Sequence, residues 1–269
     1  MTSGLLAGKA ILVTGAGGRI GQEMVAVLSR EGAAVASADL TAESAEAGAR
    51  RAAGQSCAVA GDVSEPADVA RIVGHAEAQL GPLAGLVNGH GIYPNTAVTD
   101  VSVEEWDRVF AVNTRGTMLT CQAVARRWTE RGAGGSIVNL SSGAANSVRR
   151  GGAHYSGSKA AVNSLTFALA MELGHLGIRV NSVEPGLILD EVFHAASGAS
   201  DYEHQGARAY VEDAVRAIPL GRSGQPADVA ETVAFLLSDR SSWTTAAVIG
   251  VNGGSSAGRT HLPFSPGIK

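Results

Sequence analysis

Tyr155 and Lys159 stand four residues apart at the start of an alanine-rich segment that has the pattern of a helix. Side chains at this spacing share one face of a helix and lie one turn apart. A free phenol has a pKa of about 10, and a cation within a few ångströms lowers that pKa by about one to three units, toward neutral pH. The pair therefore predicts a general acid–base catalyst, with chance spacing as the alternative.

Ser142 follows the apolar run 137–140, which has the pattern of a buried strand. In parallel α/β proteins, ligands bind at the carboxyl ends of the strands. A hydroxyl at this edge can polarise a carbonyl. The serine therefore predicts a carbonyl or alcohol as the reacting group.

A glycine-rich loop separates the first apolar strand from the helix that follows it. Residues 14–21 read Thr-Gly-Ala-Gly-Gly-Arg-Ile-Gly, between a strand at 10–14 and a helix at about 20–31. Glycines allow the backbone to approach a pyrophosphate, whose charge the amides and the dipole of the helix N-terminus then stabilise. An ordinary turn is the alternative, but the position after a buried strand favours a dinucleotide site.

Asp39 lies 24 residues after Gly15, at the end of a second strand at 33–38. A carboxylate there accepts hydrogen bonds from ribose hydroxyls and repels a 2′-phosphate, which favours NAD over NADP. Arg19 complicates this choice, because a guanidinium attracts the extra phosphate. NAD is preferred because Leu40 and Thr41, not a basic residue, follow Asp39. The alternative role for Asp39 is to cap the next helix.

The chain alternates short apolar runs with longer amphipathic segments, the pattern of a parallel α/β sheet. Further strands are expected at 56–59, 83–88, 135–140, 178–183 and 246–251. The sequence thus predicts a doubly wound Rossmann fold of about seven strands with helices on both faces. We expect one domain at 1–254, with a substrate loop at about 187–218, and a C-terminal tail at 255–269.

Composition excludes several classes of protein. A net charge of −4 over 269 residues makes nucleic acid a poor partner. Cys57 and Cys121 are too few for a disulfide framework or a metal cluster. No run approaches the roughly 20 apolar residues of a membrane span, and no signal peptide is visible. We expect a cytoplasmic protein without a metal.

Taken together, these motifs resemble the short-chain dehydrogenase/reductase family, and the match extends over residues 14–254. Its most specific element is the Tyr-x-x-x-Lys pair with a serine 13 positions before the tyrosine. The resemblance implies that Ser142 orients the substrate and Tyr155 is the acid–base. It implies that Lys159 binds the nicotinamide ribose and lowers the tyrosine pKa, and that Asn113 holds a water in a proton relay.

The motifs and the resemblance also give an expected set of binding residues. For NAD these are Gly15, Gly18, Arg19, Ile20, Gly21, Asp39, Leu40, Asp62, Val63, Asn88, Gly89, Gly91, Tyr155, Lys159, Pro185, Gly186 and Ile188. For the substrate they are Ser142, Val148, Arg149, Tyr155, Leu187 and Phe193. Arg149 and Arg150 either hold an anionic substrate group or are simply solvated.

Four positions depart from the family pattern. Arg19 replaces a glycine, as in the pteridine-reductase branch, and Asp190 stands where a threonine often binds the carboxamide. Gly89 and His90 replace an Asn-Ala pair. His90 either reaches the cofactor or substrate or is a packed histidine.

The expected function is hydride transfer between NAD(H) and a secondary alcohol or ketone, such as a polyol or sugar. The alternatives are an NADP-dependent ketone reductase of oxoacyl or pteridine type and a non-catalytic dinucleotide-binding protein. The helix after Tyr155 carries more apolar residues than one buried stripe needs, so a homotetramer or homodimer is expected. These residues are Ala160, Ala161, Leu165, Phe167, Ala168 and Met171.

Overall fold

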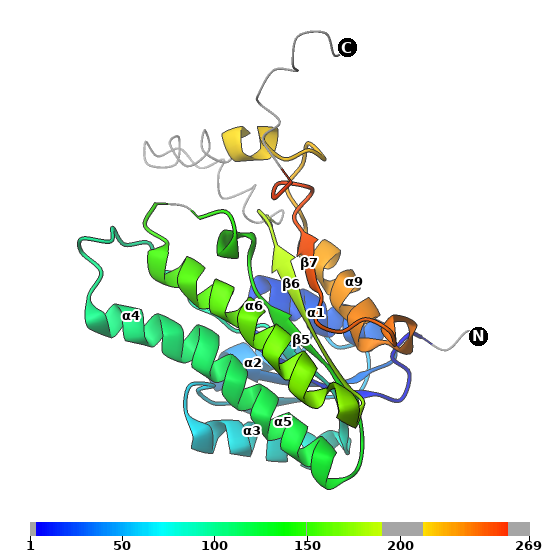
Figure 1. Ribbon diagram of the computed structural model, residues 1–269. Coiled ribbons are helices and arrows are strands. Elements are labelled where there is room, and N and C mark those ends of the chain that lie inside the picture. Colours follow the sequence, from blue (N-terminus) through cyan, green and yellow to red (C-terminus); the bar gives the residue numbers. More distant parts are fainter. Residues whose placement is uncertain (1–3, 149, 190–211, 258–269) are drawn as a thin grey trace.

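The computed structural model describes residues 4–148, 150–189 and 212–257 of the chain. Seven strands form one sheet in the order β3-β2-β1-β4-β5-β6-β7, and all of its neighbouring strands are parallel. The strands are β1 (Ala10–Thr14), β2 (Ala34–Asp39), β3 (Ser56–Ala60), β4 (Leu83–Asn88), β5 (Gly135–Leu140), β6 (Ile178–Pro185) and β7 (Val248–Val251). The predicted doubly wound sheet with helices on both faces is confirmed (Figure 1).

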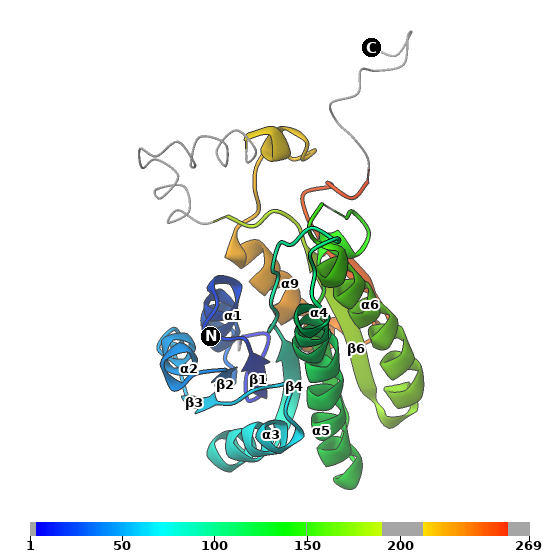
Figure 2. The same ribbon diagram turned by 90° about the vertical axis from the view of Figure 1, so that its left-hand side faces the viewer.

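Helices cover both faces of this sheet, as Figures 1 and 2 show. The longer ones are α1 (Arg19–Arg30), α2 (Ala42–Ala49), α3 (Pro66–Leu80), α4 (Val103–Phe110), α5 (Thr117–Glu130), α6 (Ala153–Leu173) and α9 (Pro226–Leu237). Short turns of helix are η1 (Ala111–Gly116), η2 (Gly143–Ala145), η3 (Gly174–Leu176) and η4 (Asp239–Ser241). Among the described residues, no helix is both long and apolar enough to cross a membrane.

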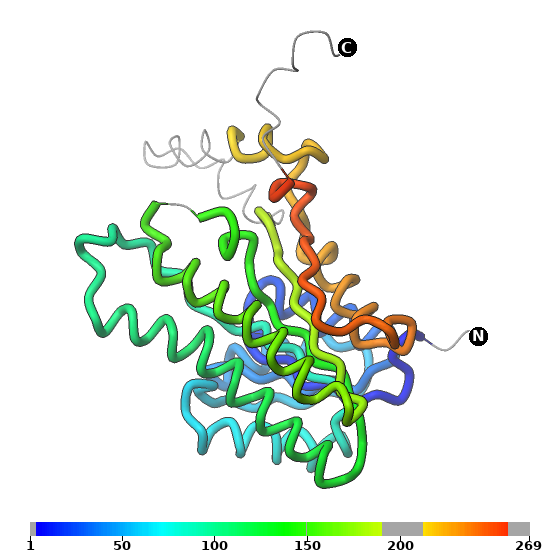
Figure 3. The backbone as a smooth tube through the Cα atoms, in the orientation of Figure 1, coloured from blue at the N-terminus to red at the C-terminus, as the bar shows by residue number. Residues whose placement is uncertain are grey.

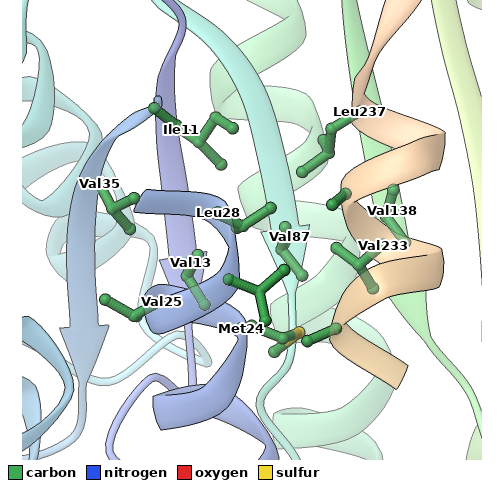
Figure 4. Packing of buried hydrophobic residues seen from close by; sticks show 14 of the residues in the cluster. Ile11, Val13, Met24, Val25, Leu28, Val35, Val87, Val138, Val233 and Leu237 are labelled. Atoms are coloured by element: carbon green, nitrogen blue, oxygen red, sulfur yellow. The ribbon is translucent and has the colours of Figure 1, made fainter. Parts of the chain in front are cut away.

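Two buried apolar clusters hold the layers together, one on each face of the sheet. In the first, α1 and α9 pack side by side on the central strands, with Met24, Leu28 and Val233 among the buried residues (Figure 4). The second joins the opposite face to α3, α5 and α6. Because β1, β2, β4, β5 and β6 contribute side chains to both clusters, these inner strands are rich in apolar residues, as parallel sheets require.

The topology fixes where a ligand can bind. β1 lies between β2 and β4, so the chain leaves the first strand toward one side of the sheet and later continues on the other. The crevice above the carboxyl ends at such a switch point is the usual ligand site of doubly wound sheets. The loops after β1, β4, β5 and β6 reach this edge, and the tube in Figure 3 shows the chain returning there after β7.

The last strand is shorter than predicted. It begins at Val248 instead of Ala246, whose backbone has a φ of 56°. A strand cannot include a residue in this left-handed conformation. The backbone therefore turns at Ala246 before it joins the sheet.

Trp128 provides a test of the core. Its side chain is fully buried, and its Nε1 donates to the Leu83 carbonyl at 2.6 Å. Trp128→Phe removes this donor from the Leu83 carbonyl and leaves a small cavity. We expect a loss of about 2 kcal/mol in the free energy of unfolding, measured by urea denaturation. An unchanged urea midpoint would show that the surrounding residues compensate for the indole.

Candidate active site

The glycine loop after β1 forms a cradle that larger residues cannot occupy. Gly15 has a φ of 66°, a conformation that L side chains rarely adopt. A Cβ at Gly21 would collide with the Gly15 carbonyl oxygen and come within 2.8 Å of the Ala16 Cα. Gly18 is the N-cap of α1, so the first amides of that helix point into the loop. This arrangement fits a pyrophosphate.

Asp39 lies at the end of β2, beside this loop. One carboxylate oxygen accepts from the Gly17 amide at 2.8 Å, and the other accepts from the Leu40 amide at 2.7 Å. Asp39 does not cap the next helix, because the N-cap of α2 is Thr41, whose hydroxyl accepts from the Ser44 amide. The carboxylate is thus oriented by the loop and faces the crevice.

A continuous cleft runs along the carboxyl edge of the sheet; we call its two halves the glycine-loop end and the tyrosine end. The halves share Arg19, Ile20, Gly89, His90, Gly91 and Tyr93. Of the predicted cofactor residues, the glycine-loop end is lined by Gly15, Gly18, Arg19, Ile20, Gly21, Asp39, Leu40, Asp62, Val63, Gly89 and Gly91. The tyrosine end adds Ser142, Tyr155, Lys159, Pro185, Gly186, Leu187 and Ile188.

The tyrosine end brings together the three residues predicted to do chemistry. Ser142 follows β5, and its Oγ accepts from the Ala144 amide at 3.1 Å. Tyr155 and Lys159 lie in the first turns of α6, and the Lys159 Nζ is 6.0 Å from the centre of the Tyr155 ring. Tyr93 meets the Tyr155 ring edge-on, with ring centres 6.2 Å apart.

Lys159 is almost completely buried, and its Nζ donates to the Leu140 carbonyl at 2.8 Å. Burial lowers the pKa of Lys159 from 10.5 to about 8, because a buried ammonium loses its hydration. Below pH 8 the lysine is nevertheless a cation beside the tyrosine. This is the electrostatic condition that lowers a phenol pKa.

The depressed pKa of Lys159 makes a prediction about stability. The unfolded lysine binds its proton more tightly than the folded one, so the cost of burying the charge is complete below pH 8. This cost disappears as the pH rises toward 10.5. We expect Lys159→Met to be more stable than the wild type by about 3 kcal/mol at pH 7, with the difference shrinking between pH 8 and 10.5. Thermal unfolding of both proteins at pH 7 and pH 10 measures this difference; a constant gap would contradict the prediction.

Two asparagines predicted for the site lie beneath the cleft and do not line it. Asn113 is fully buried in the π-helical turn η1, where its side chain accepts from the Ile92 amide at 2.8 Å and donates to the Ile92 carbonyl at 2.9 Å. Its Nδ2 also lies 2.9 Å from the Ser158 hydroxyl. Asn88 donates to Asn139 Oδ1 at 2.9 Å, within the sheet. Both side chains hold the floor of the cleft.

The predicted substrate residues are only partly brought together. Leu187 joins Ser142 and Tyr155 at the tyrosine end, whereas Val148 and Arg150 line a separate apolar pocket next to the start of α6. Val148 therefore does not line the cleft. Arg149, Phe193 and Asp190 lie outside the described residues, as does the 190–211 part of the expected substrate loop.

Sequence reasoning missed several residues of the tyrosine end, notably Tyr93, Leu189, Ser255 and Ser256. The position of Tyr93 was a usable signal, because it follows the turn after β4, next to the switch point. Ser255 and Ser256 belong to the segment interpreted as a tail, yet they line the cleft. The Asn252 amide holds Ser256 by a 3.0 Å hydrogen bond to its hydroxyl.

Comparisons with known proteins agree with this geometry. The family model described as enoyl-(acyl carrier protein) reductase matches residues 15–256. The chain is 39% identical to the (3R)-3-hydroxyacyl-CoA dehydrogenase of Mus musculus over 257 residues, covering 90% of this chain and 94% of that protein. It is 34% identical to the sorbitol dehydrogenase of Cereibacter sphaeroides over 254 residues, covering 93% and 98%.

A solved structure shows the same similarity in three dimensions. The short-chain type dehydrogenase/reductase from Mycobacterium marinum superimposes with a TM-score of 0.82 at 32% identity, covering 94% of this chain and 97% of that one. The chain with this glycine loop, parallel sheet and Ser-Tyr-Lys cleft thus aligns with these dehydrogenases over almost their whole length. This chain belongs to the short-chain dehydrogenase/reductase family, whose members bind nicotinamide dinucleotides.

Proposed function

We propose that the protein is an NAD(H)-dependent oxidoreductase that interconverts a secondary alcohol and its ketone. The observation that carries the proposal is the joint lining of one cleft by Ser142, Tyr155 and Lys159, continuous with the glycine loop and Asp39. Relatives that oxidise hydroxyacyl-CoA and sorbitol support a CH–OH group as the reacting centre. A small polyol, sugar or similar compound is our proposed substrate class.

In the proposed mechanism the chain's own residues move the proton. The Ser142 hydroxyl and the Tyr155 hydroxyl hold the substrate oxygen, and Tyr155 takes its proton during oxidation or returns it during reduction. The Lys159 ammonium stabilises the Tyr155 phenolate, which takes up the proton on oxidation and is formed again on reduction. The nicotinamide supplies the hydride acceptor or donor when the cofactor is bound.

The glycine loop would hold the pyrophosphate, with Asp39 at the adenosine ribose and Asp62 and Val63 near the adenine. Lys159 would hold the nicotinamide ribose, and residues 185–188 would lie beside the nicotinamide. We propose NAD because the Asp39 carboxylate repels a 2′-phosphate at the glycine-loop end. Arg19 lines both halves of the cleft and favours anions, so NADP is the alternative. We also propose a cytoplasmic location, which the free thiols of Cys57 and Cys121 support.

The test is a panel of secondary alcohols, polyols and sugars with NAD or NADP at equal concentration, followed by NADH or NADPH absorbance. Turnover with NAD and at least one alcohol is the expected result. A clear preference for NADP would refute the cofactor assignment. Dinucleotide binding without turnover of any alcohol or ketone would favour the non-catalytic alternative.

Assembly forms a further part of the proposal. One face of α6 exposes Ala160, Ser164, Phe167, Ala168 and Met171, and no charged residue lies between 160 and 171. Met171 is 82% exposed and Phe167 is 46% exposed. We propose that this stripe packs against a second copy in a homotetramer.

Replacing Phe167 and Met171 together with glutamate places charges in the proposed interface and disfavours association. We expect light scattering to show the wild-type mass halved or reduced to that of a monomer. Glu172→Gln, on the neighbouring exposed position, is the control and keeps the wild-type mass. A monomeric wild type would overturn the assembly proposal.

A further inference from the structure

His90 occupies an unusual place in the cleft. It lies in the turn that follows β4, it is 7% exposed, and it lines both the glycine-loop end and the tyrosine end. Its ring contacts two threonines: Nδ1 is 2.6 Å from the Thr14 Oγ1, and Nε2 is 3.3 Å from the Thr117 Oγ1. The proposed reaction uses none of these three side chains.

The direction of each hydrogen bond follows from counting hydrogens. The Thr117 hydroxyl donates its single hydrogen to the Asn113 carbonyl at 2.8 Å, so it can only accept from His90 Nε2. Burial and the charge of Lys159 lower the pKa of His90 to about 3, although a hydrogen bond to the Val112 backbone and the charge of Asp62 act in the opposite direction. The ring is thus neutral. The Thr14 Oγ1 lies closer to Nδ1, at 2.6 Å, than to the Val87 carbonyl, at 3.3 Å, so we assign its hydrogen to Nδ1 and the single ring hydrogen to Nε2.

This chain of hydrogen bonds connects two elements that flank the cleft. Thr14 ends β1 immediately before the glycine loop, and Thr117 begins α5 immediately after η1. The turn that carries His90 is also held at Ile92, whose amide and carbonyl both bind the Asn113 side chain. Residues 89–92 are therefore attached to β1 on one side and twice to the η1–α5 segment on the other.

The space around the ring leaves this turn little freedom to move. A Cβ at Gly116 would lie 3.2 Å from His90 Nε2 and 2.9 Å from the Val63 Cγ2, so glycine is needed where the ring meets η1. A Cβ at Gly91 would lie 3.2 Å from the Lys159 Nζ. The position of residues 89–92 therefore determines how closely the backbone at Gly91 approaches Lys159.

We propose that His90 is a positioning residue: it bridges β1 and α5 by hydrogen bonds and fixes residues 89–92 against Lys159, beneath the cofactor. The proposal rests on the proposed function for the identity of the cofactor. His90 itself transfers no proton. Its contribution is to keep the floor of the cleft in the geometry that receives the nicotinamide half.

The first test compares NADH affinity, measured by titration calorimetry, among variants that keep the fold by circular dichroism. His90→Ala removes the ring that both threonine hydroxyls contact and is expected to weaken NADH binding about tenfold. Thr117→Val removes one end of the bridge and is expected to weaken it about threefold. His90→Gln, which keeps one donor and one acceptor, is expected to restore most of the affinity.

Thr129→Val is the matched control. Thr129 lies on the same helix and its hydroxyl donates to the carbonyl four residues earlier, as that of Thr117 does, but it is remote from the cleft. Wild-type affinity is expected for this variant. Equal affinities of wild type and His90→Ala, or no recovery in His90→Gln, would overturn the positioning role.

The second test needs no cofactor. In protein labelled with ¹⁵N-histidine, the resonances that vanish in His90→Gln belong to His90. They are expected to show a neutral ring protonated at Nε2, unchanged from pH 5 to pH 9. Titration in this range, or protonation at Nδ1, would refute the assigned bridge. If instead the wild type binds neither NADH nor NADPH, the proposed function is wrong. The ¹⁵N spectrum of His90 still tests the assigned hydrogen bonds in that case.

Discussion

Tyr155→Phe is expected to lower the rate of alcohol oxidation about a thousandfold while the affinity for NADH stays within about twofold of the wild type. The substitution removes one oxygen and keeps the ring that Tyr93 contacts edge-on. The rate falls because no other described hydroxyl at the tyrosine end has a buried ammonium one helical turn away. Steady-state rates with a substrate from the panel, together with calorimetric NADH titration, measure the two quantities.

The control for this experiment is the next residue in the helix. The Ser156 hydroxyl is buried and has no hydrogen-bond partner among the residues that the structure describes, so Ser156→Ala removes an oxygen from the same turn of α6 without breaking a described hydrogen bond. This variant is expected to turn over at the wild-type rate. If Tyr155→Phe did so too, the proposed acid–base chemistry would be wrong.

Asp39→Ser is expected to raise the ratio of kcat/KM with NADP to kcat/KM with NAD by about two to four orders of magnitude. The variant loses the carboxylate that would accept hydrogen bonds from the ribose hydroxyls of NAD. Hydrogen bonds to a charged group contribute about 1.5–3 kcal/mol to binding. It also loses the repulsion of a 2′-phosphate, of similar size. Together these effects correspond to the stated change in the ratio.

The ratio is the right quantity, because Asp39 also anchors the glycine loop through the Gly17 amide. Displacement of that loop weakens the binding of NAD and of NADP equally, so this effect cancels in the ratio. Glu43→Gln removes an equal charge from the exposed first turn of α2 and should leave the ratio unchanged. An unchanged ratio in Asp39→Ser would mean that the carboxylate does not select the cofactor.

The sheet was predictable because buried parallel strands have a simple sequence signature. β1, β4 and β5 have the predicted boundaries, since β1 and β4 end at the polar residues Thr14 and Asn88 and the polar Ser141 follows β5. The catalytic candidates were equally visible, because Tyr155 and Lys159 share one helix. Spacing along one element determines their proximity without knowledge of the rest of the fold.

Other features depend on contacts between distant segments and left no local pattern. The π-helical turn η1 adds no recognisable break to the amphipathic pattern of the flanking helices. Val148 was expected at the substrate because it follows Ser142 closely, but the turn after η2 directs it into the neighbouring pocket. Ser255 and Ser256 reach the cleft because Asn252 and the end of β7 direct them there, and no periodicity marks this return.

Two backbone hydrogen bonds tie the segment after β6 to the residues before α9: the Leu189 amide donates to the Gly224 carbonyl, and the Gly224 amide donates to the Leu187 carbonyl, both at 2.9 Å. These bonds bring the two ends of the intervening segment together next to β6 and α9. The cost of closing such a loop grows only slowly with its length. The part of the chain from Leu189 to Gly224 is therefore a natural unit for exchange with the corresponding part of a relative, and we propose this exchange as a test of whether it selects the substrate.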